Sequence, residues 1–517
     1  MKTKVLLNFF LIFLYHTLLA QEQKEVPTPQ WRPVYHFTPL KNWTNDPNGL
    51  IYLNGVYHLY NQQNPFENKW GHMSWGHATT TDLVHWKHLP IAIPESIDKD
   101  TTWRFSGSAV LDKNNTSGLC KSKSCIVAVY TAHQPNLKKE SQFIAYSNDG
   151  GKTFTNYEHN PVIDLHKKDF RDPNVFWFKK TKQWVMTVAL PTEHKVRFYA
   201  SNDLKSWNLL SEFGPQGYIN AGWECPFLIQ LPVTGKPSLQ KWVLMVSAGG
   251  PERGPFMQYF VGDFDGTKFK SDNPSDTILT VDYGDCFYAA IPWNNLPGNK
   301  KIFIGWMVPG RQETYPWKGQ MSIPRDINLK ETNNGIRLVQ QPSSLIKNNL
   351  VKFSRNNVIE MKDVKMTNQE MTVGKRELTQ GNSFWLETEL IVEPGTIAGF
   401  KIAQKKDNNN KPIEEVEIGY DALKNQLYID KSKSGNGKIR KDKLVQTIDL
   451  LNEKGKIKME ILFDKSSLEI FINNGERVLT TYIFPETDAN ELSAFASGKN
   501  TMIKSLKVWD LSNLENE

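Results

Sequence analysis

Cysteine is scarce in this sequence, which holds only four among 517 residues. Cys120, Cys125, Cys225 and Cys286 form no CxxC pair and join no Cys/His cluster at the spacing of a zinc site. The sequence therefore predicts no metal site, and nothing in it indicates a cofactor. Cys120 and Cys125 flank a short polar loop, so a local disulfide and two free thiols both stay open as interpretations.

Long hydrophobic runs are missing as well. The apolar run VLLNFFLIFL at residues 5–14 is too short to cross a membrane, and no later segment is long enough. Lys2 and Lys4 precede this run, which is the arrangement of a secretory signal peptide. We therefore predict a signal peptide at residues 1–20, export to the periplasm or the exterior, and no membrane span.

The charge balance lacks a strong bias. The chain has 62 Lys and Arg against 55 Asp and Glu, a formal net charge of +7, with no Lys-rich or Arg-rich run. This argues against a nucleic-acid partner. Low-complexity tracts are absent too, whereas aromatic residues reach 12% and the chain holds 33 Gly and 28 Pro. Many aromatics with frequent turn residues indicate β-structure.

One short pattern recurs along the first part of the chain. An extended run ends in an Asp turn, and an aromatic residue follows four or five positions later, at Asp82, Asp149, Asp203 and Asp265. The spacings of 67, 54 and 62 residues suit four antiparallel strands with their loops. We therefore predict a five-bladed β-propeller over residues 34–335, with unrelated hairpins as the alternative.

The amino-acid composition changes after the propeller region. Residues 336–349 read as a linker, and from residue 350 the chain is richer in Lys and Glu and poorer in Trp. Short alternating runs such as SFWLETELIV and KIKMEILFD follow, with turn signals between them. This pattern predicts a β-sandwich domain at residues 350–512, so the expected fold class is all-β.

Three acidic residues lie in turn-forming, aromatic settings: WTNDPNG, FRDPN and WECP contain Asp46, Asp172 and Glu224. Each occupies a similar phase of its blade, and Ser106 and Tyr288 take that phase in the other two blades. Five segments therefore meet at one end of the propeller axis. Carboxylates beside aromatic faces suit a carbohydrate, and two acids can serve as nucleophile and general acid/base in glycoside hydrolysis. Turn acids that only cap loops are the alternative.

These segments resemble the successive motifs of glycoside hydrolase family 32, which contains invertases, inulinases, levanases and fructan exohydrolases. FSGS, YHLYNQQNP, IFIGWM and DKSSLEIFINNGERVLTTYIFP add to the resemblance, which covers about residues 34–510. The resemblance implies a propeller followed by a β-sandwich, with Asp46 as nucleophile, Glu224 as general acid/base and Asp172 as transition-state stabiliser. It also implies a fructosyl pocket that is lined by Asn45, Gln62, Trp70, Phe105, Ser106, Arg171, Tyr288 and Trp306.

The expected activity is that of a secreted retaining hydrolase. It releases terminal β-D-fructofuranosyl units from fructans, either levan or inulin, and from sucrose. An invertase dedicated to sucrose is the alternative within this chemistry, and a non-catalytic carbohydrate-binding propeller is the alternative from another class. The sequence leaves open the linkage preference, exo against endo action, and the oligomeric state.

Overall fold

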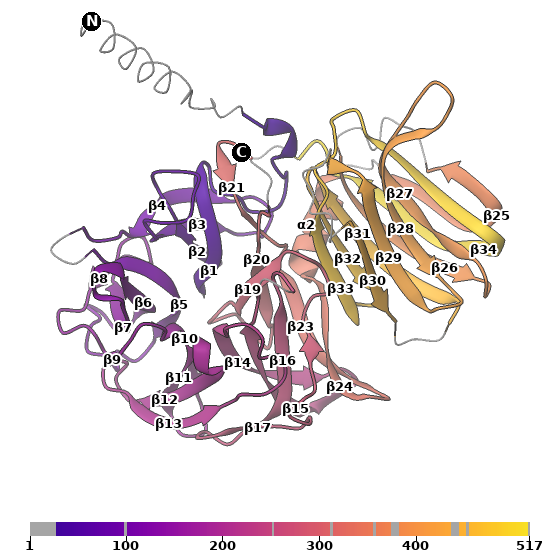
Figure 1. The fold of residues 1–517 in the computed structure, drawn as a ribbon. Helices are drawn as coiled ribbons and strands as arrows, with labels where there is room; N and C mark the ends of the chain where they lie inside the picture. The colour runs from indigo at the N-terminus through magenta and orange to yellow at the C-terminus, as the bar shows by residue number, and fades with distance from the viewer. Residues whose placement is uncertain are drawn as a thin grey trace, which may run out of the picture.

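The computed structural model describes residues 27–97, 101–250, 253–310, 314–354, 358–373, 382–435, 444–450 and 454–514. Strands dominate this part of the chain, and the predicted all-β class is confirmed. The predicted signal peptide at residues 1–20 lies outside the described residues. Figure 1 shows the two parts of the molecule, a ring of twisted sheets and a sandwich of long strands beside it.

The ring is the predicted β-propeller. Its first two blades are made of β1 (Asn42–Leu53), β2 (Val56–Gln63), β3 (Ser74–Thr80) and β4 (Lys87–Ile93), then β5 (Trp103–Asp112), β6 (Cys125–Gln134), β7 (Lys139–Ser147), β8 (Thr155–Asn156) and β9 (Ile163–Lys167). The third is made of β10 (Arg171–Phe178), β11 (Gln183–Leu190), β12 (Lys195–Ser201) and β13 (Asn208–Phe213). The first strand of each blade lies nearest the axis (Figure 1).

The fourth and fifth blades join in one hydrogen-bonded sheet, through a short parallel contact between β14 and β23. The fourth is made of β14 (Glu224–Val233), β15 (Lys236–Ser247), β16 (Met257–Phe264), β17 (Phe269–Ser271) and β18 (Leu279–Thr280). The fifth is made of β19 (Phe287–Pro292), β20 (Ile302–Met307), β22 (Gln320–Met321), β23 (Arg325–Thr332) and β24 (Gly335–Pro342). The ring closes where β21 (Trp317–Lys318) pairs in parallel with the start of β1.

The recurring Asp marks the same turn in four blades. Each lies between the third and fourth strands of its blade, and its Oδ1 accepts two backbone N–H groups two to four residues ahead, at 2.7–3.1 Å. These residues are Asp82, Asp149, Asp203 and Asp265. A side chain that satisfies the turn's own backbone donors stabilises a tight reversal. The sequence repeat therefore reports one turn per blade.

Asn294, which follows β19, ties several blades together near the axis. Its backbone N–H donates to the carbonyl of Leu50 at 2.9 Å, and its carbonyl accepts from the N–H of Tyr52 at 3.0 Å. Its side-chain Nδ2 donates to the carbonyl of Ala109 at 2.9 Å and to that of Val175 at 3.4 Å. One amide side chain thus satisfies carbonyls from the first strands of blades two and three, where a ring of twisted sheets leaves them without a neighbouring strand.

A β-sandwich follows the propeller, as predicted. Its strands are β25 (Val358–Thr372), β26 (Ser383–Val392), β27 (Ile397–Lys406), β28 (Pro412–Asp421), β29 (Gln426–Lys433), β30 (Val445–Asp449), β31 (Lys456–Asp464), β32 (Ser467–Ile472), β33 (Arg477–Tyr482) and β34 (Glu491–Asp510). The long strand β34 pairs with β27 over its first half and with β26 over its second half. The two layers therefore share one bent strand.

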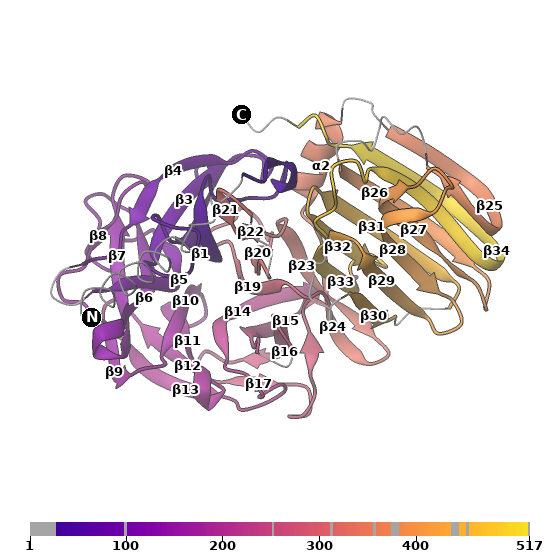
Figure 2. The same ribbon diagram turned by 45° about the horizontal axis from the view of Figure 1, so that its top comes forward.

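Residues 336–349, the predicted linker, take regular structure. They comprise most of β24 and the start of the helix α2 (Ser344–Phe353). Ile346 and Leu350 of this helix are buried. They belong to a hydrophobic cluster that contains residues of both the propeller and the sandwich, so the connection is packed between them. Both views show the sandwich against the fifth blade (Figures 1 and 2).

A buried network of charged groups joins the two parts. His36 contacts Asp464 through Nδ1 and Glu469 through Nε2, each at 2.8 Å. Arg325 donates to Glu469 and, at 2.9 Å, to Asp282. The side chains of His36, Arg325, Asp464 and Glu469 are fully buried. Buried ionic groups that keep their partners fix one relative placement of the segments that carry them, because separating the partners would leave a charge buried without a counter-ion.

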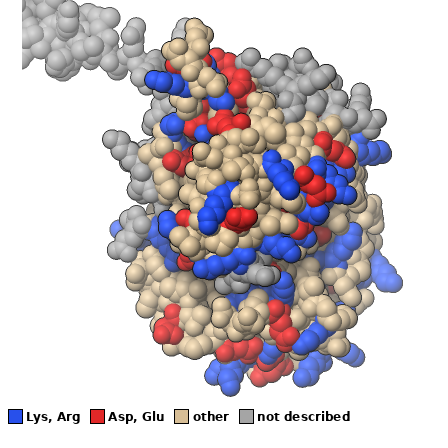
Figure 3. Space-filling model, turned by 90° about the vertical axis from the view of Figure 1, so that its right-hand side faces the viewer, with Lys and Arg blue, Asp and Glu red and all other residues tan. Residues whose placement is uncertain are grey.

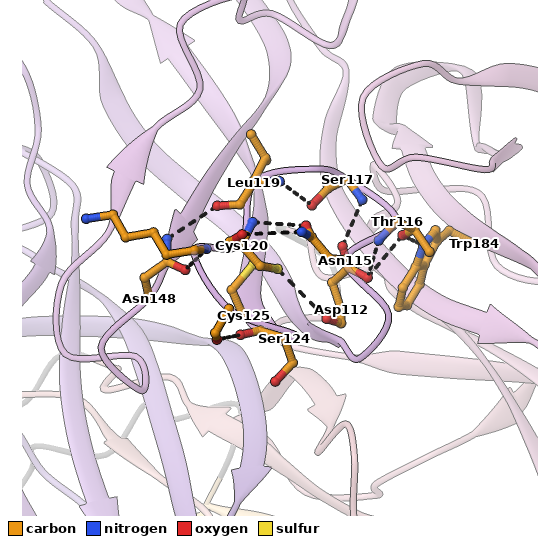
Figure 4. Close-up of a disulfide and its surroundings, with 12 residues drawn as sticks. Asp112, Asn115, Thr116, Ser117, Leu119, Cys120, Ser124, Cys125, Asn148 and Trp184 are labelled. Atoms are coloured by element: carbon orange, nitrogen blue, oxygen red, sulfur yellow. Dashed lines mark hydrogen bonds between the residues drawn. A yellow bond between two sulfur atoms is a disulfide. The ribbon is translucent and has the colours of Figure 1, made fainter.

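The structure resolves the open question about the first two cysteines in favour of a disulfide, which joins Cys120 to Cys125. The loop before it is held by Asn115, whose Oδ1 accepts from the N–H of Cys120 at 3.0 Å (Figure 4). Asp112 accepts from the N–H groups of Thr116 and Ser117, both at 2.9 Å. The bridge closes the connection between β5 and β6, at the end of the blade that faces away from Ser106.

The surface carries both signs of charge. On the face seen in Figure 3, Lys and Arg side chains alternate with Asp and Glu over the sandwich side of the molecule. Across the described ranges, no helix is both long enough and apolar enough to cross a membrane.

Candidate active site

The five first strands of the blades share one irregularity. Each loses its regular pairing with the second strand at an equivalent place: between Thr44 and Pro47, Arg104 and Gly107, Arg171 and Asn174, Glu224 and Phe227, and Tyr288 and Ile291. Such a bulge redirects side chains that a regular strand would place on its faces. The residues inside these intervals include Asp46, Ser106 and Asp172, so the predicted common phase corresponds to a common backbone feature.

Asp46 lies in β1 with its carboxylate buried and surrounded by donors. Its Oδ2 accepts hydrogen bonds from Ser106 Oγ at 2.6 Å and from Gln62 Nε2 at 3.1 Å, and its Oδ1 accepts from Asn45 Nδ2 at 3.3 Å. Burial raises the pKa of Asp46, the Ser106 hydrogen bond opposes that rise, and the charge of Glu224 adds to it. The neighbours thus fix one orientation of this carboxylate.

Asp172 lies in β10 in a left-handed backbone conformation, with φ of 67°. Its backbone N–H donates to Thr131 Oγ1 at 2.9 Å, and its Oδ2 accepts from the N–H of Cys225 at 2.9 Å. Burial raises the pKa of Asp172; the Arg171 charge opposes this, and the charges of Glu224 and Asp46 reinforce it. A non-glycine residue at positive φ is costly, and such strain concentrates at functional sites.

Glu224 begins β14, and its side chain keeps 33% of its surface exposed. Its Oε1 accepts from Arg171 Nε at 3.1 Å, and its Oε2 accepts from the hydroxyl of Tyr288 at 2.7 Å. Arg171 in turn donates to Glu140, at 3.0 Å to the nearer oxygen. Glu224 therefore faces the open part of the site, while blades three and five hold both of its oxygens.

Aromatic side chains stand around these carboxylates. Trp70 is 52% exposed and meets the rings of Trp103 and Phe105 edge to face, at centroid distances of 5.3 and 6.0 Å. Trp306 pairs with Tyr288 across β20 and β19, and its ring lies 5.9 Å from that of Trp43. Exposed and half-buried indole rings of this kind offer flat apolar faces for sugar rings.

The structure places Asp46, Asp172 and Glu224 in one electrostatic cluster, as the common phase predicted. Direct contacts join Asn45, Gln62 and Ser106 to Asp46 and join Arg171 and Tyr288 to Glu224. Trp70, Phe105 and Trp306 connect to the cluster through ring contacts and strand pairing.

Two residues of this cluster were missed by the sequence analysis. The Cys225 thiol lies 3.5 Å from Asp46 Oδ2 and 3.6 Å from Asp172 Oδ2, and burial raises its pKa, with the charges of Asp172 and Asp46 adding to the rise. In the sequence, the only feature that could have pointed to Cys225 as a site residue is its position directly after Glu224 in WECP. Glu140, which anchors Arg171, lies in β7 within a segment that carries no motif.

The chemistry of the cluster is that of carboxylates and a guanidinium. Among the residues that the structure describes, no group of three or more His, Cys, Asp and Glu is arranged to hold a metal ion. Asp46 and Glu224 differ in setting: the first is buried among uncharged donors, and the second is partly exposed beside Arg171. Two carboxyl groups in unlike environments can divide the roles of nucleophile and proton donor.

Comparison with protein-family models gives two matches. Residues 36–342 match the model of the glycosyl hydrolases family 32 N-terminal domain, and residues 350–510 match the model of the family 32 C-terminal domain. Together these two matches span most of the chain.

Among known proteins, the chain is 41% identical over 502 residues to a levanase from Bacillus subtilis (strain 168), covering 94% of this chain and 71% of that protein. It is 37% identical over 531 residues to an extracellular exo-inulinase from Aspergillus ficuum, covering 94% and 95%.

Solved structures of similar proteins share the fold of this chain. The exo-inulinase from Aspergillus awamori superposes with a TM-score of 0.83 at 35% identity, covering 94% of this chain and 99% of that chain. A fructofuranosidase from Schwanniomyces occidentalis, solved in complex with fructose, also gives 0.83, at 30% identity and with coverage of 94% and 99%.

Proposed function

The chain belongs to glycosyl hydrolase family 32 and is a glycosidase, and we propose that it releases terminal β-D-fructofuranosyl units from fructans and from sucrose with retention of configuration. Levan and inulin are the proposed polymers, because the relatives include a levanase and an exo-inulinase. The proposed division of the chain is a catalytic propeller from residue 34 and a sandwich at residues 350–512, with residues 336–349 completing the fifth blade and beginning α2 between them.

One observation carries this proposal: Asp46 and Glu224 come from different blades, and their oxygens are held in different ways. Asp46 receives hydrogen bonds from Ser106, Gln62 and Asn45 while it is almost fully buried. Glu224 is held by Arg171 and Tyr288 at the exposed side of the cluster. A fixed, buried carboxylate suits the nucleophile, and a carboxyl group that is open to solvent suits the group that exchanges protons with leaving group and water.

The proposed reaction has two steps. Asp46 attacks the anomeric carbon C2 of the terminal fructosyl unit, the glycosidic C–O bond breaks, and Glu224 gives its proton to the departing oxygen. A covalent fructosyl-enzyme results. Glu224, now ionised, takes a proton from water as the water oxygen attacks C2 and the bond to Asp46 breaks. Fructose is released with its original configuration, and both carboxyl groups return to their starting states.

The other residues of the cluster have positioning and binding roles in this proposal. Asp172, held by the Cys225 N–H, accepts hydrogen bonds from sugar hydroxyls and stabilises the positive charge that develops on the ring. Arg171 and Tyr288 orient Glu224. The walls of the pocket are the aromatic residues Trp70, Phe105 and Trp306, which stack against sugar rings.

Export is part of the proposal. Lys2, Lys4 and the apolar run at 5–14 support a signal peptide at residues 1–20 that directs the protein to the periplasm or the exterior. The name of the Aspergillus ficuum relative describes an extracellular enzyme. The disulfide between Cys120 and Cys125 also suits an oxidising compartment.

Product analysis tests the activity. Purified protein is incubated with sucrose, inulin or levan, and the sugars are resolved over time, with Asp46→Ala as the inactive control. We expect fructose as the sole early product of a polymer, and a loss of at least about 10⁴-fold in rate for the variant, because removing a nucleophile removes the covalent route. Methanol as acceptor should give methyl β-fructofuranoside, the retained product.

The same experiment separates the alternatives. Hydrolysis of sucrose without release of fructose from either polymer identifies a dedicated invertase. Oligosaccharides as the first products identify endo action. Saccharide binding without hydrolysis, equal in the parent protein and in Asp46→Ala, identifies a binding propeller and overturns the proposed catalysis.

A further inference from the structure

The propeller has a cavity of about 1000 Å³ at the end opposite the carboxylate cluster. The strands β5, β10, β14 and β19 carry Ser106, Asp172, Glu224 and Tyr288 near their first residues, and their last residues line this cavity. Asn294 also lines it, and the side chain of Asn294 spans from Ala109 to Val175. The cavity is therefore separate from the proposed catalytic site although the same strands build both.

Lysines outnumber acidic residues around this cavity. Its lining includes the five lysines Lys113, Lys179, Lys180, Lys300 and Lys301, and none of them forms an ion pair within the described part of the chain. The one acidic residue of the lining is Asp112. Its carboxylate is fully buried and accepts hydrogen bonds from the N–H groups of Thr116 and Ser117. The cavity therefore presents a positive potential that an anion would complement.

Lys301 lies in the cavity wall close enough to Lys179 for the two positive charges to repel each other. Its side chain is half-buried where the loop between β19 and β20 ends, and desolvation lowers its pKa, with the charge of Lys179 lowering it further. Partial loss of water around an ammonium group without an acidic partner costs free energy, and a second ammonium group nearby adds to the cost. An anion between the two lysines would relieve both contributions.

Aromatic rings and amides complete the lining. Trp177 is 37% exposed and lies edge to face on Trp184, with ring centroids 4.9 Å apart. Trp242 packs against Phe178 at 5.8 Å on the neighbouring blade. Amide side chains are present at Asn114, Gln230, Gln240 and Asn299. Flat aromatic faces beside amides recognise sugar rings and hydroxyl groups, so the cavity combines sugar-binding chemistry with anion-binding chemistry.

We propose that this cavity binds an anionic oligosaccharide, with its carboxylate or sulfate groups on Lys179 and Lys301 and a sugar ring against Trp177. The volume lies at the upper end of the roughly 300–1,000 Å³ that small-ligand sites occupy. Such a site would hold the enzyme on an acidic glycan while the opposite end of the propeller stays open to its own substrate. The inference does not depend on which fructan the enzyme cleaves.

Calorimetric titration of the full-length protein tests this inference with three probes: trigalacturonate, a chondroitin sulfate tetrasaccharide and inorganic phosphate. We expect at least one of the two saccharides to bind with an affinity that falls as NaCl is raised, because the contacts are ionic. Lys179→Glu should weaken that binding at least 10-fold, and Trp177→Ala should weaken it several-fold. Lys499→Glu, the same charge reversal at an exposed position on the sandwich, should leave it unchanged.

Three results would overturn the proposal. Binding of phosphate without either saccharide shows a simple anion site. Absence of binding by all three probes shows that the cavity takes no anionic ligand of this class. Saccharide binding that is equal in the parent protein and in Lys179→Glu places the ligand elsewhere. Equal melting temperatures of the parent and the variants establish that a loss of binding comes from the substituted side chain. Trigalacturonate and the sulfated tetrasaccharide together identify which anionic group the lysines prefer.

Discussion

The hydroxyl of Ser106 donates a 2.6 Å hydrogen bond to Oδ2 of Asp46. The two residues come from the first strands of neighbouring blades, 60 positions apart in the chain. Gln62 donates to the same oxygen at 3.1 Å, so two neutral donors face one carboxylate oxygen. Hydrogen bonds to a carboxylate favour its ionised form, which is the form that attacks as a nucleophile.

Replacing Ser106 by Ala should therefore raise the pKa of Asp46 further, because the bond that opposes the effect of burial is lost. The acidic limb of the kcat/KM profile should move to higher pH, and kcat should fall about 10-fold or more. A pH–rate series on sucrose measures both. Ser108→Ala is the matched control, since the Ser108 hydroxyl accepts from the N–H of Val175 at 2.9 Å and does not touch Asp46. An unmoved acidic limb in Ser106→Ala would contradict the assigned role.

Tyr288→Phe should lower kcat with little change in KM. Its hydroxyl donates to Glu224 Oε2 at 2.7 Å, and its removal leaves only Arg171 to orient that carboxyl group. Loss of one positioning hydrogen bond in a proton-transfer group costs on the order of 10- to 100-fold. Steady-state kinetics on sucrose give the split between kcat and KM. Tyr259→Phe serves as the control. It removes a buried tyrosine hydroxyl whose hydrogen bond is to the N–H of Leu338 and not to Glu224. Equal losses in both variants would point to a general effect on folding.

The network between propeller and sandwich predicts a loss of stability in alkaline solution. Burial alone lowers the pKa of His36, but its hydrogen bonds to Asp464 and Glu469 raise the pKa from its ordinary value of 6.5 to about 9. Because the folded pKa lies above the unfolded one, the stabilisation is fully present below pH 6.5 and disappears as the pH rises through 9. The amount is up to about 3 kcal/mol, from the roughly 1.4 kcal/mol that each pH unit of difference represents.

Urea or thermal unfolding between pH 6 and pH 10 measures this effect. His36→Gln keeps hydrogen-bonding atoms but cannot be protonated, so its stability should change less over that window than the parent's does. It should also be less stable than the parent at pH 6, where Asp464 and Glu469 lose a cationic partner. Parallel stability curves for the two proteins across the whole window would show that another group governs the alkaline loss.

The disulfide should contribute modestly to stability. Cys120 and Cys125 are five positions apart, and closing so short a loop stabilises a protein by about 2 kcal/mol in the chain-entropy model. The double variant Cys120→Ser, Cys125→Ser should lose about that amount in chemical denaturation. The parent protein in reducing buffer provides the comparison, since it should match the double variant. A parent protein that is unaffected by reductant, with a destabilised variant, would trace the loss to the new serines.

Part of the fold can be predicted from the sequence because the residues that determine it interact with near neighbours in the chain. Asp82 and Asp203 satisfy backbone donors within their own turns, so the signal lies within a few residues, and its repetition counts the blades. The common phase of Asp46 and Glu224 is readable for the same reason, because each first strand carries its bulge at the same point. The connector at 336–349 was less well predicted, since its residues gain regular structure by pairing and packing with distant parts.

The sequence alone determined the all-β class, the repeat, and the acids that stand at one end of the propeller axis, because alternation, turn chemistry and spacing depend on neighbours in the chain. What surrounds those acids depends on tertiary packing. The thiol of Cys225 between two carboxylates, the anchoring of Arg171 by Glu140, and the buried pairing of His36 with Asp464 join segments up to 428 positions apart. Such contacts form when segments far apart in the chain pack together, and no local pattern specifies which partners that packing brings into contact.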